Sequence, residues 1–209
     1  MTIAPTQIER GKRDKELRRQ AFIDAATAVF AERGYDPATT REIAERAGCA
    51  EGLIHRYFQG KRGLLLAILE ERAHRVVDDF VSALPDRQTV FEELRDVLFW
   101  HLDTMWERRD FMRVAVSQAA VDSEVGQTIN KGIHNERVRL IRDKLRRHQK
   151  AGRIDSRADL TATSQGIANL GFALGFSFQV SLNQDRAEAR RIALSAAQAL
   201  ARGISRRSR

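Results

Sequence analysis

The side chains best suited to chemistry gather between residues 39 and 61, and their types suit contact with a nucleic acid. Arg56 carries a guanidinium group, which can donate two hydrogen bonds to a guanine in the major groove of DNA. His55 can donate to a base or a phosphate, and Leu53 can contact the methyl group of a thymine. The sequence has no nucleophile with its base, no catalytic pair of carboxylates and no phosphate-cradling loop, so we do not expect an enzyme.

Two short helices joined by a tight turn are expected to hold these side chains. Thr39 and Glu42 have the spacing of a capping box, which satisfies free backbone N–H groups at the start of a helix. Gly48 can take the positive φ angle that ends this first helix. The second helix is expected over residues 51–58. Its inward-facing side chains are expected to be Ile54, Tyr57 and Phe58. This is the geometry of a helix-turn-helix, whose second helix enters the major groove.

The start of the first of these helices is a second candidate for DNA contact. Thr39, Thr40 and Arg41 lie there, where free N–H groups and the helix dipole favour a phosphate. Residues 10–19 hold an excess of basic side chains. We expect them to form a solvated face rather than to enter the minor groove.

The segment resembles the tetracycline-repressor (TetR) family of transcriptional regulators. The resemblance rests on the threonine-started helix, on Ala47-Gly48, and on Tyr57-Phe58-Gln59-Gly60-Lys61 followed by three leucines. It is strong over residues 16–70, and elsewhere it extends only to helical layout and length. It implies that Tyr57 and Lys61 contact phosphates.

Three positions depart from the family pattern. Ala50 stands where serine is usual, which removes a cap and a phosphate donor. Glu51 replaces a frequent lysine or arginine, and it can accept a hydrogen bond from a cytosine amino group. His55 stands where tyrosine is common. The resemblance therefore implies DNA contacts at these positions but leaves the target sequence open.

Composition narrows the class of protein. The chain has 209 residues and a formal net charge of +8, which favours a polyanionic partner. Cys49 is the single cysteine, so no intrachain disulfide forms, which fits a reducing cytoplasm. No apolar run suits a membrane span or a signal peptide. We expect a cytoplasmic protein with no membrane partner, no cofactor and no metal site.

The few prolines and a 3.6-residue apolar periodicity favour an all-α fold of about nine helices. Besides the two short helices, we expect helices at about residues 16–33, 61–84, 88–107, 110–121, 124–151, 159–183 and 185–204. The domain organisation expected is a flexible basic arm at 1–15, a helix-turn-helix domain at 16–62 and a ligand-binding and dimerisation domain at 63–209. The fourth helix is long enough to belong to both domains.

A ligand pocket is expected around the fifth helix. The run Val97-Leu98-Phe99-Trp100 makes that helix apolar nearly all round, which is typical of a helix enclosed by others. In the family, the corresponding helix crosses the ligand domain. The side chains expected to line a pocket are Trp100, His101, Met105, Trp106, Phe111, Met112, Asn169, Phe172 and Phe176. The alternative is that these side chains only fill the core.

The last two helices are rich in small residues. In the family these helices pair with their copies in a four-helix dimer interface. The residues expected there are Gly171, Gly175, Ala189, Ala193, Ala196, Ala197 and Leu200. Close approach of a helix within the same chain, or room for a ligand, is the alternative reason for the glycines.

These patterns predict a ligand-responsive regulator of transcription. We expect a repressor that binds a palindromic double-stranded DNA operator as a homodimer and is released by a small, largely apolar effector. A regulator without an effector, or an activator, is the alternative. For the basic stretch from Arg137 to Arg157, we favour a solvated helix face over an anionic effector site or a second nucleic-acid contact.

Overall fold

The computed structural model describes residues 7–206, with side chains from Arg13 onward. Its helices in chain order are α1 (Gln7–Arg33), α2 (Thr40–Ala47), α3 (Gly52–Phe58), α4 (Lys61–Ala83), α5 (Val90–Glu107), α6 (Arg109–Val121), α7 (Ser123–Thr128), the π-helix η1 (Ile129–His134), α8 (Asn135–Lys150), α9 (Leu160–Phe172), the π-helix η2 (Ala173–Ser181) and α10 (Arg186–Ile204). Because α7, η1 and α8 are continuous, as are α9 and η2, the described residues form nine helices, which confirms the all-α fold. Within residues 7–206, no helix combines the length and apolar character needed to cross a bilayer.

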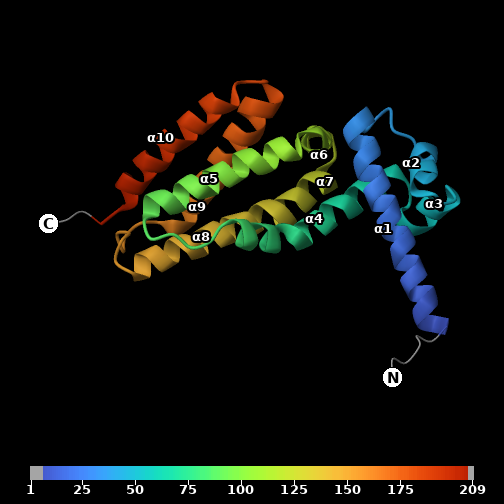
Figure 1. The fold of residues 1–209 in the computed structure, drawn as a ribbon, viewed down its shortest axis with the longest axis horizontal. Helices are drawn as coiled ribbons and strands as arrows, with labels where there is room; N and C mark the ends of the chain where they lie inside the picture. The colour runs from blue at the N-terminus through green and yellow to red at the C-terminus, as the bar shows by residue number, and fades with distance from the viewer. Residues whose placement is uncertain (1–6, 207–209) are drawn as a thin grey trace.

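The helices form a small head and a longer body (Figure 1). The head consists of α1, α2 and α3, and the body consists of α5 to α10. The long helix α4 runs from the head into the body, as the sequence predicts. Within the body, α6 and α7 lie at the end that meets the head. A shape change in the body can therefore reach the head through α4 and through α6.

The first helix is longer than the sequence predicts. It begins at Gln7 rather than at Glu16, so residues 7–15 continue a helix. This segment lies beyond Pro5 and is rich in glutamate, lysine and arginine, which are good helix formers. The rest of the expected arm, residues 1–6, lies outside the described residues.

The turn between α2 and α3 forms as expected. Thr39 Oγ1 accepts a hydrogen bond from the backbone N–H of Glu42 at 3.1 Å, and the Glu42 carboxylate accepts one from the Thr39 N–H at 3.2 Å. Gly48 ends α2 in the left-handed conformation, with φ 63° and ψ 31°. Because a side chain is strained in that conformation, glycine suits the turn that aims α3.

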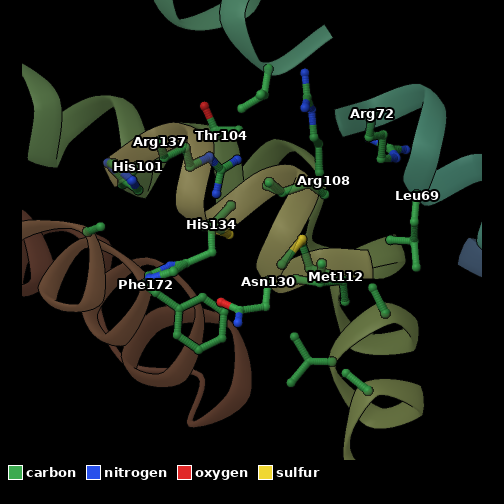
Figure 2. Close-up of a pocket in the computed structure, with 18 of the residues that line it drawn as sticks. Leu69, Arg72, His101, Thr104, Arg108, Met112, Asn130, His134, Arg137 and Phe172 are labelled. Atoms are coloured by element: carbon green, nitrogen blue, oxygen red, sulfur yellow. The ribbon is translucent and has the colours of Figure 1, made fainter. Parts of the chain in front are cut away.

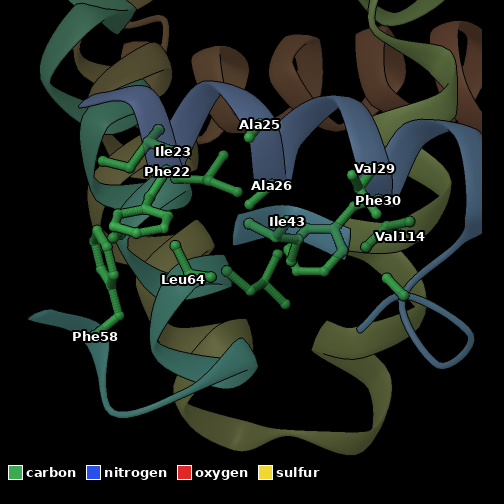
Figure 3. Close-up of a cluster of buried hydrophobic side chains, with 14 of the residues drawn as sticks. Phe22, Ile23, Ala25, Ala26, Val29, Phe30, Ile43, Phe58, Leu64 and Val114 are labelled. Atoms are coloured by element: carbon green, nitrogen blue, oxygen red, sulfur yellow. The ribbon is translucent and has the colours of Figure 1, made fainter. Parts of the chain in front are cut away.

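A single apolar core joins the head to the body (Figure 3). Phe22 and Phe30 of α1, Ile43 of α2 and Leu64 of α4 are fully buried in it. Val114 of α6 belongs to the same core, as Figure 3 shows. Each such side chain stabilises the fold by about 1.5–3 kcal/mol. Since α6 shares this core, a displacement of α6 disturbs the packing of the head.

An ion cluster is buried at the end of the body away from the head. The carboxylate of Glu93 on α5 is 2% exposed and lies 2.8 Å from Lys144 Nζ and 2.6 Å from an Arg147 guanidinium nitrogen. His148 Nε2 lies 3.2 Å from the same carboxylate. Lys144 and His148 are buried, so the solvated face expected for residues 137–157 is wrong at these positions. Burying a charge is costly unless it is paired, and Glu93 supplies the pair.

Candidate DNA-binding face and effector cavity

The helix α3 presents a polar edge to solvent and an apolar edge to the core. His55 and Arg56 are exposed, whereas Ile54 and Phe58 are buried. Tyr57 is only half-buried, and so is Leu53. The two side chains best able to read base edges are therefore free to enter a major groove.

The residues at the start of α2 are partly engaged within the chain. Thr40 Oγ1 donates a hydrogen bond to Glu51 Oε1 at 2.6 Å, which links the start of α2 to the start of α3. Arg41 pairs with Glu45 at 2.9 Å on the exposed face of α2. Glu51 makes no capping bond to α3, and Ala50 has no side-chain oxygen to make one. The hydroxyl of Thr40 is thus already bonded to a carboxylate of the same chain.

Lys61 has a different role from the predicted phosphate contact. Its ammonium donates hydrogen bonds to the carbonyls of Tyr35, Asp36 and Ala38 at 2.8, 3.1 and 3.0 Å. It also lies 4.5 Å from the centre of the Tyr35 ring. An ammonium has three donors. All three are used to close the loop between α1 and α2, so in this structure Lys61 is a positioning residue of the head.

Basic side chains of α1 lie beside the recognition helix. Lys15 Nζ is 5.9 Å from the centre of the Tyr57 ring, and the guanidinium of Arg19 is 5.6 Å from that of Phe58. Both contacts place positive charge beside the C-terminal end of α3. The sequence shows the charges, but only the packing of α1 on α3 places them at the DNA-binding face.

A cavity of about 390 Å³ lies where α4, α5, α6, η1, α8 and α9 meet (Figure 2). Its volume falls in the range typical of small-molecule sites. The predicted pocket residues that line it are Trp100, His101, Met105, Phe111, Met112, Asn169 and Phe172. Trp106 and Phe176 do not line it. Phe176 is buried and stacks on Phe172 with ring centres 5.4 Å apart, and the Trp106 ring contacts Arg109 and Arg186.

His101 is a buried, neutral part of the cavity wall. It is 1% exposed, and its Nδ1 lies 2.8 Å from the carbonyl oxygen of Val97. Burial, aided by the positive charge of Arg137, lowers the pKa of His101 to about 3. The ring is therefore uncharged at neutral pH, and its Nδ1–H donates a hydrogen bond to the carbonyl oxygen of Val97.

Charged residues that the pocket prediction lacked also line the cavity. Arg72 and Asp79 come from α4, Arg108 follows α5, and Arg137 lies on α8. In Figure 2, Arg72, Arg108 and Arg137 lie on one side of the pocket, and Asn130, Met112 and Phe172 lie on the other. The basic stretch beginning at Arg137 was the one available signal in the sequence, because the other charges lie on distant helices.

Comparisons with known proteins agree with this architecture. The family model described as bacterial regulatory proteins, tetR family, matches residues 22–68, which include α2, α3 and the start of α4. The fatty acid metabolism regulator protein of Bacillus subtilis is 29% identical over 93 residues, which are 44% of this chain and 48% of that protein. The regulator SrpR of Pseudomonas putida is 39% identical over 71 residues, which are 34% of this chain and 33% of that protein.

The head of the chain is thus similar to the tetR family of bacterial regulatory proteins. Its matches span half or less of these two curated relatives. The fold likeness extends further than the sequence likeness. The structure of FadR from Bacillus subtilis in complex with stearoyl-CoA superposes with a TM-score of 0.69 at 24% identity, covering 88% of this chain and 98% of that one.

Outside the matched residues, most of the residues predicted at a dimer interface are buried within the chain itself. A Cβ at Gly171 would lie 2.7 Å from His101, and one at Gly175 would lie 3.0 Å from Met105, so these glycines let η2 and α9 approach α5 closely. Ala189, Ala193 and Ala197 are fully buried in the core of the body. A partner chain has no access to these positions, which corrects the prediction. The two remaining residues, Ala196 and Leu200, are half-buried.

Proposed function

We propose that the protein is a transcriptional repressor that binds a palindromic DNA operator as a homodimer and releases it when an effector fills the cavity. The observation that carries this proposal is the head: the exposed Arg56 and His55 lie on the second helix of a helix-turn-helix with a complete capping box and turn. The family match over residues 22–68 supports the same function.

A homodimer gives this head a matching DNA geometry. Two recognition helices related by a two-fold axis read half-sites about 34–36 Å apart, which is one turn of the duplex. The outer faces of α9 and α10 are the candidates for the contact, because their inner faces already pack on α5. Leu182, which follows η2, and Leu194 of α10 are 65% and 42% exposed. These exposed apolar side chains favour contact with a partner chain at this surface.

The cavity is the proposed effector site because it touches the elements that carry the head. Phe111, Met112 and Ala115 of α6 line it, and Phe111 and Ala115 also belong to the core of the head. At the other end of α6, Arg62 of α4 binds Asp122 at 2.6 Å and Glu124 at 2.6 Å. A ligand that pushes α6 therefore moves α4 and the head together. In a dimer, the two heads can be spaced to fit the operator or spaced differently. The effector shifts the balance between these two conformations only if it binds one of them more tightly than the other.

Selection of bound duplexes from a random pool tests the proposal. The expected result is a two-fold symmetric sequence whose half-sites are one helical turn apart, bound by a dimer in analytical ultracentrifugation. Enrichment of no sequence, or of an asymmetric one bound by a monomer, would overturn the operator and dimer parts of the proposal. Purified RNA polymerase on a promoter that carries the selected site would then separate repression from activation.

A further inference from the structure

The cavity holds more positive than negative charge. Three guanidinium groups, those of Arg72, Arg108 and Arg137, belong to its wall, whereas Asp79 is the one carboxylate among its lining residues. That carboxylate is already bound to Arg108, whose Nη2 lies 2.8 Å from Asp79 Oδ2. Among the described residues, Asp79 forms no ion pair with Arg72 or Arg137, although its charge attracts both.

Arg72 and Arg137 have no ordinary partner among the described residues. Their Nε atoms are buried, and in residues 13–206 neither atom has a hydrogen-bond acceptor. Each guanidinium instead lies over an aromatic ring, Arg72 at 4.3 Å from the centre of Phe111 and Arg137 at 5.2 Å from that of Trp100. A ring face attracts a cation, but it does not accept the N–H bonds of a guanidinium in the way an anion does.

Both arginines remain charged despite their enclosure. Burial, and next the nearby charge of Arg108, lower the pKa of Arg72 and of Arg137 to about 10. At neutral pH the two groups therefore stay protonated, although desolvation of an unpaired charge is costly. An anion that enters the cavity would recover this cost, and a neutral molecule would not.

The remainder of the wall is mostly apolar, and its uncharged polar members are His101, Thr104, Asn130, His134 and Asn169. Met112 and Phe172 lie across the pocket from the arginines in Figure 2, and Ile129 and Ile133 of η1 belong to the same wall. A ligand that satisfies both parts needs an anionic head and an apolar tail. Arginine binds a carboxylate through two parallel N–H bonds, so Arg72 on α4 and Arg137 on α8 are the candidate donors to the anionic head.

We propose that the effector is an amphipathic carboxylate, with its carboxylate between Arg72 and Arg137 and its apolar tail toward Met112 and Phe172. This rests on the proposed function of the cavity as the effector site. The sequence alone predicts a largely apolar effector. The proposal replaces that prediction with an effector whose charged head group contributes much of the binding free energy. A ligand bound in this way contacts α4, α6 and α8. Its carboxylate is therefore in direct contact with α4, the helix that runs into the head.

Calorimetric titration with three probes that share one tail tests the proposal: decanoate, decanol and decyltrimethylammonium. We expect the wild-type protein to bind decanoate about 10-fold to 100-fold more tightly than decanol, the range for hydrogen bonds between charged groups. Decyltrimethylammonium should bind more weakly than decanol because the arginines repel it. Decanol equal to or tighter than decanoate, or no binding of decanoate, would overturn the proposal.

Two variants on α8 assign the effect to the cavity. Arg137→Met keeps an unbranched apolar stem and removes the charge, so decanoate should lose most of its preference over decanol. Arg142→Met is the matched control, since Arg142 lies on the same helix and also has a buried Nε without a partner but does not line the cavity. An unchanged preference in Arg137→Met, with circular dichroism showing a folded protein, contradicts the proposal. Titration of both variants with the selected duplex, in the absence of decanoate, tests DNA binding by itself. Its result bears on the proposed function and not on the chemical class of the effector.

Discussion

The head and the body keep their charged side chains in different places. In the head, Arg56, His55 and Arg41 lie on the surface above an apolar core, and they can meet a partner without desolvating anything inside the protein. In the body, Lys144 and His148 are buried in an ion cluster, and the Nε of Arg137 is buried in the cavity wall. The charges of the head are thus open to solvent, whereas those of the body are enclosed, either paired as at Glu93 or placed in the cavity wall as at Arg137.

The strongest test of this contrast is the buried carboxylate of Glu93. Glu93→Gln should destabilise the protein by about 3–5 kcal/mol, because it leaves Lys144 and Arg147 without their buried partner. Urea unfolding followed by circular dichroism measures the change. Glu107→Gln, at an exposed position on the same helix, is the control and should change the free energy of unfolding by less than about 0.5 kcal/mol. A loss below about 1 kcal/mol in Glu93→Gln would show that the cluster is not needed for the fold.

Lys61 tests the same contrast in the head. Lys61→Met removes a charged donor from three carbonyls, and we expect a loss of about 1.5–3 kcal/mol of stability. Urea unfolding and the salt dependence of DNA binding should be measured together. If Lys61 instead contacts a phosphate, the variant keeps its stability, and the slope of log affinity against log salt falls by about one unit.

Arg56 should act on DNA without affecting the fold. Arg56→Ala should weaken binding to the selected duplex by about 1–3 kcal/mol and relax the preference at one base pair, because the side chain is exposed and free to read a base. Fluorescence anisotropy with selected and random duplexes measures both affinities. Equal losses on the two duplexes would assign Arg56 to the phosphate backbone instead.

The smallest effect is expected from the enclosed cation of the cavity. Arg137→Met should raise the free energy of unfolding by about 1 kcal/mol, because it removes an unpaired charge and leaves an apolar chain against Trp100. Thermal unfolding without any ligand shows whether the variant is more or less stable than the wild-type protein. A lower melting temperature would mean that the guanidinium stabilises the fold through its contact with Trp100.

The head could be predicted from the sequence because its signals are local. The capping box at Thr39, the left-handed Gly48 and the spacing of Ile54 and Phe58 each depend on a few neighbouring residues, and the structure confirms them. Lys61 was assigned by resemblance, and the structure gives it another set of partners.

The body could be predicted only in part. Aromatic residues at helical spacing indicated the cavity, and seven of the nine predicted residues line it. Small residues such as Gly171 and Ala193 indicate close helix packing, but spacing alone does not tell a helix of the same chain from one of a partner. The charged wall was missed because Arg72, Arg108 and Arg137 meet only when α4, α5 and α8 pack together.

If the surface charge of the head binds DNA and the enclosed charge of the body binds the molecule that releases it, one measurement shows both. It is the affinity for the selected duplex, with and without saturating decanoate, in the wild-type protein and in Arg137→Met. We expect equal DNA binding by both proteins without decanoate, a loss of at least about 10-fold with decanoate in the wild type, and little loss in the variant. Decanoate that leaves wild-type DNA binding unchanged, or that weakens both proteins equally, would contradict it.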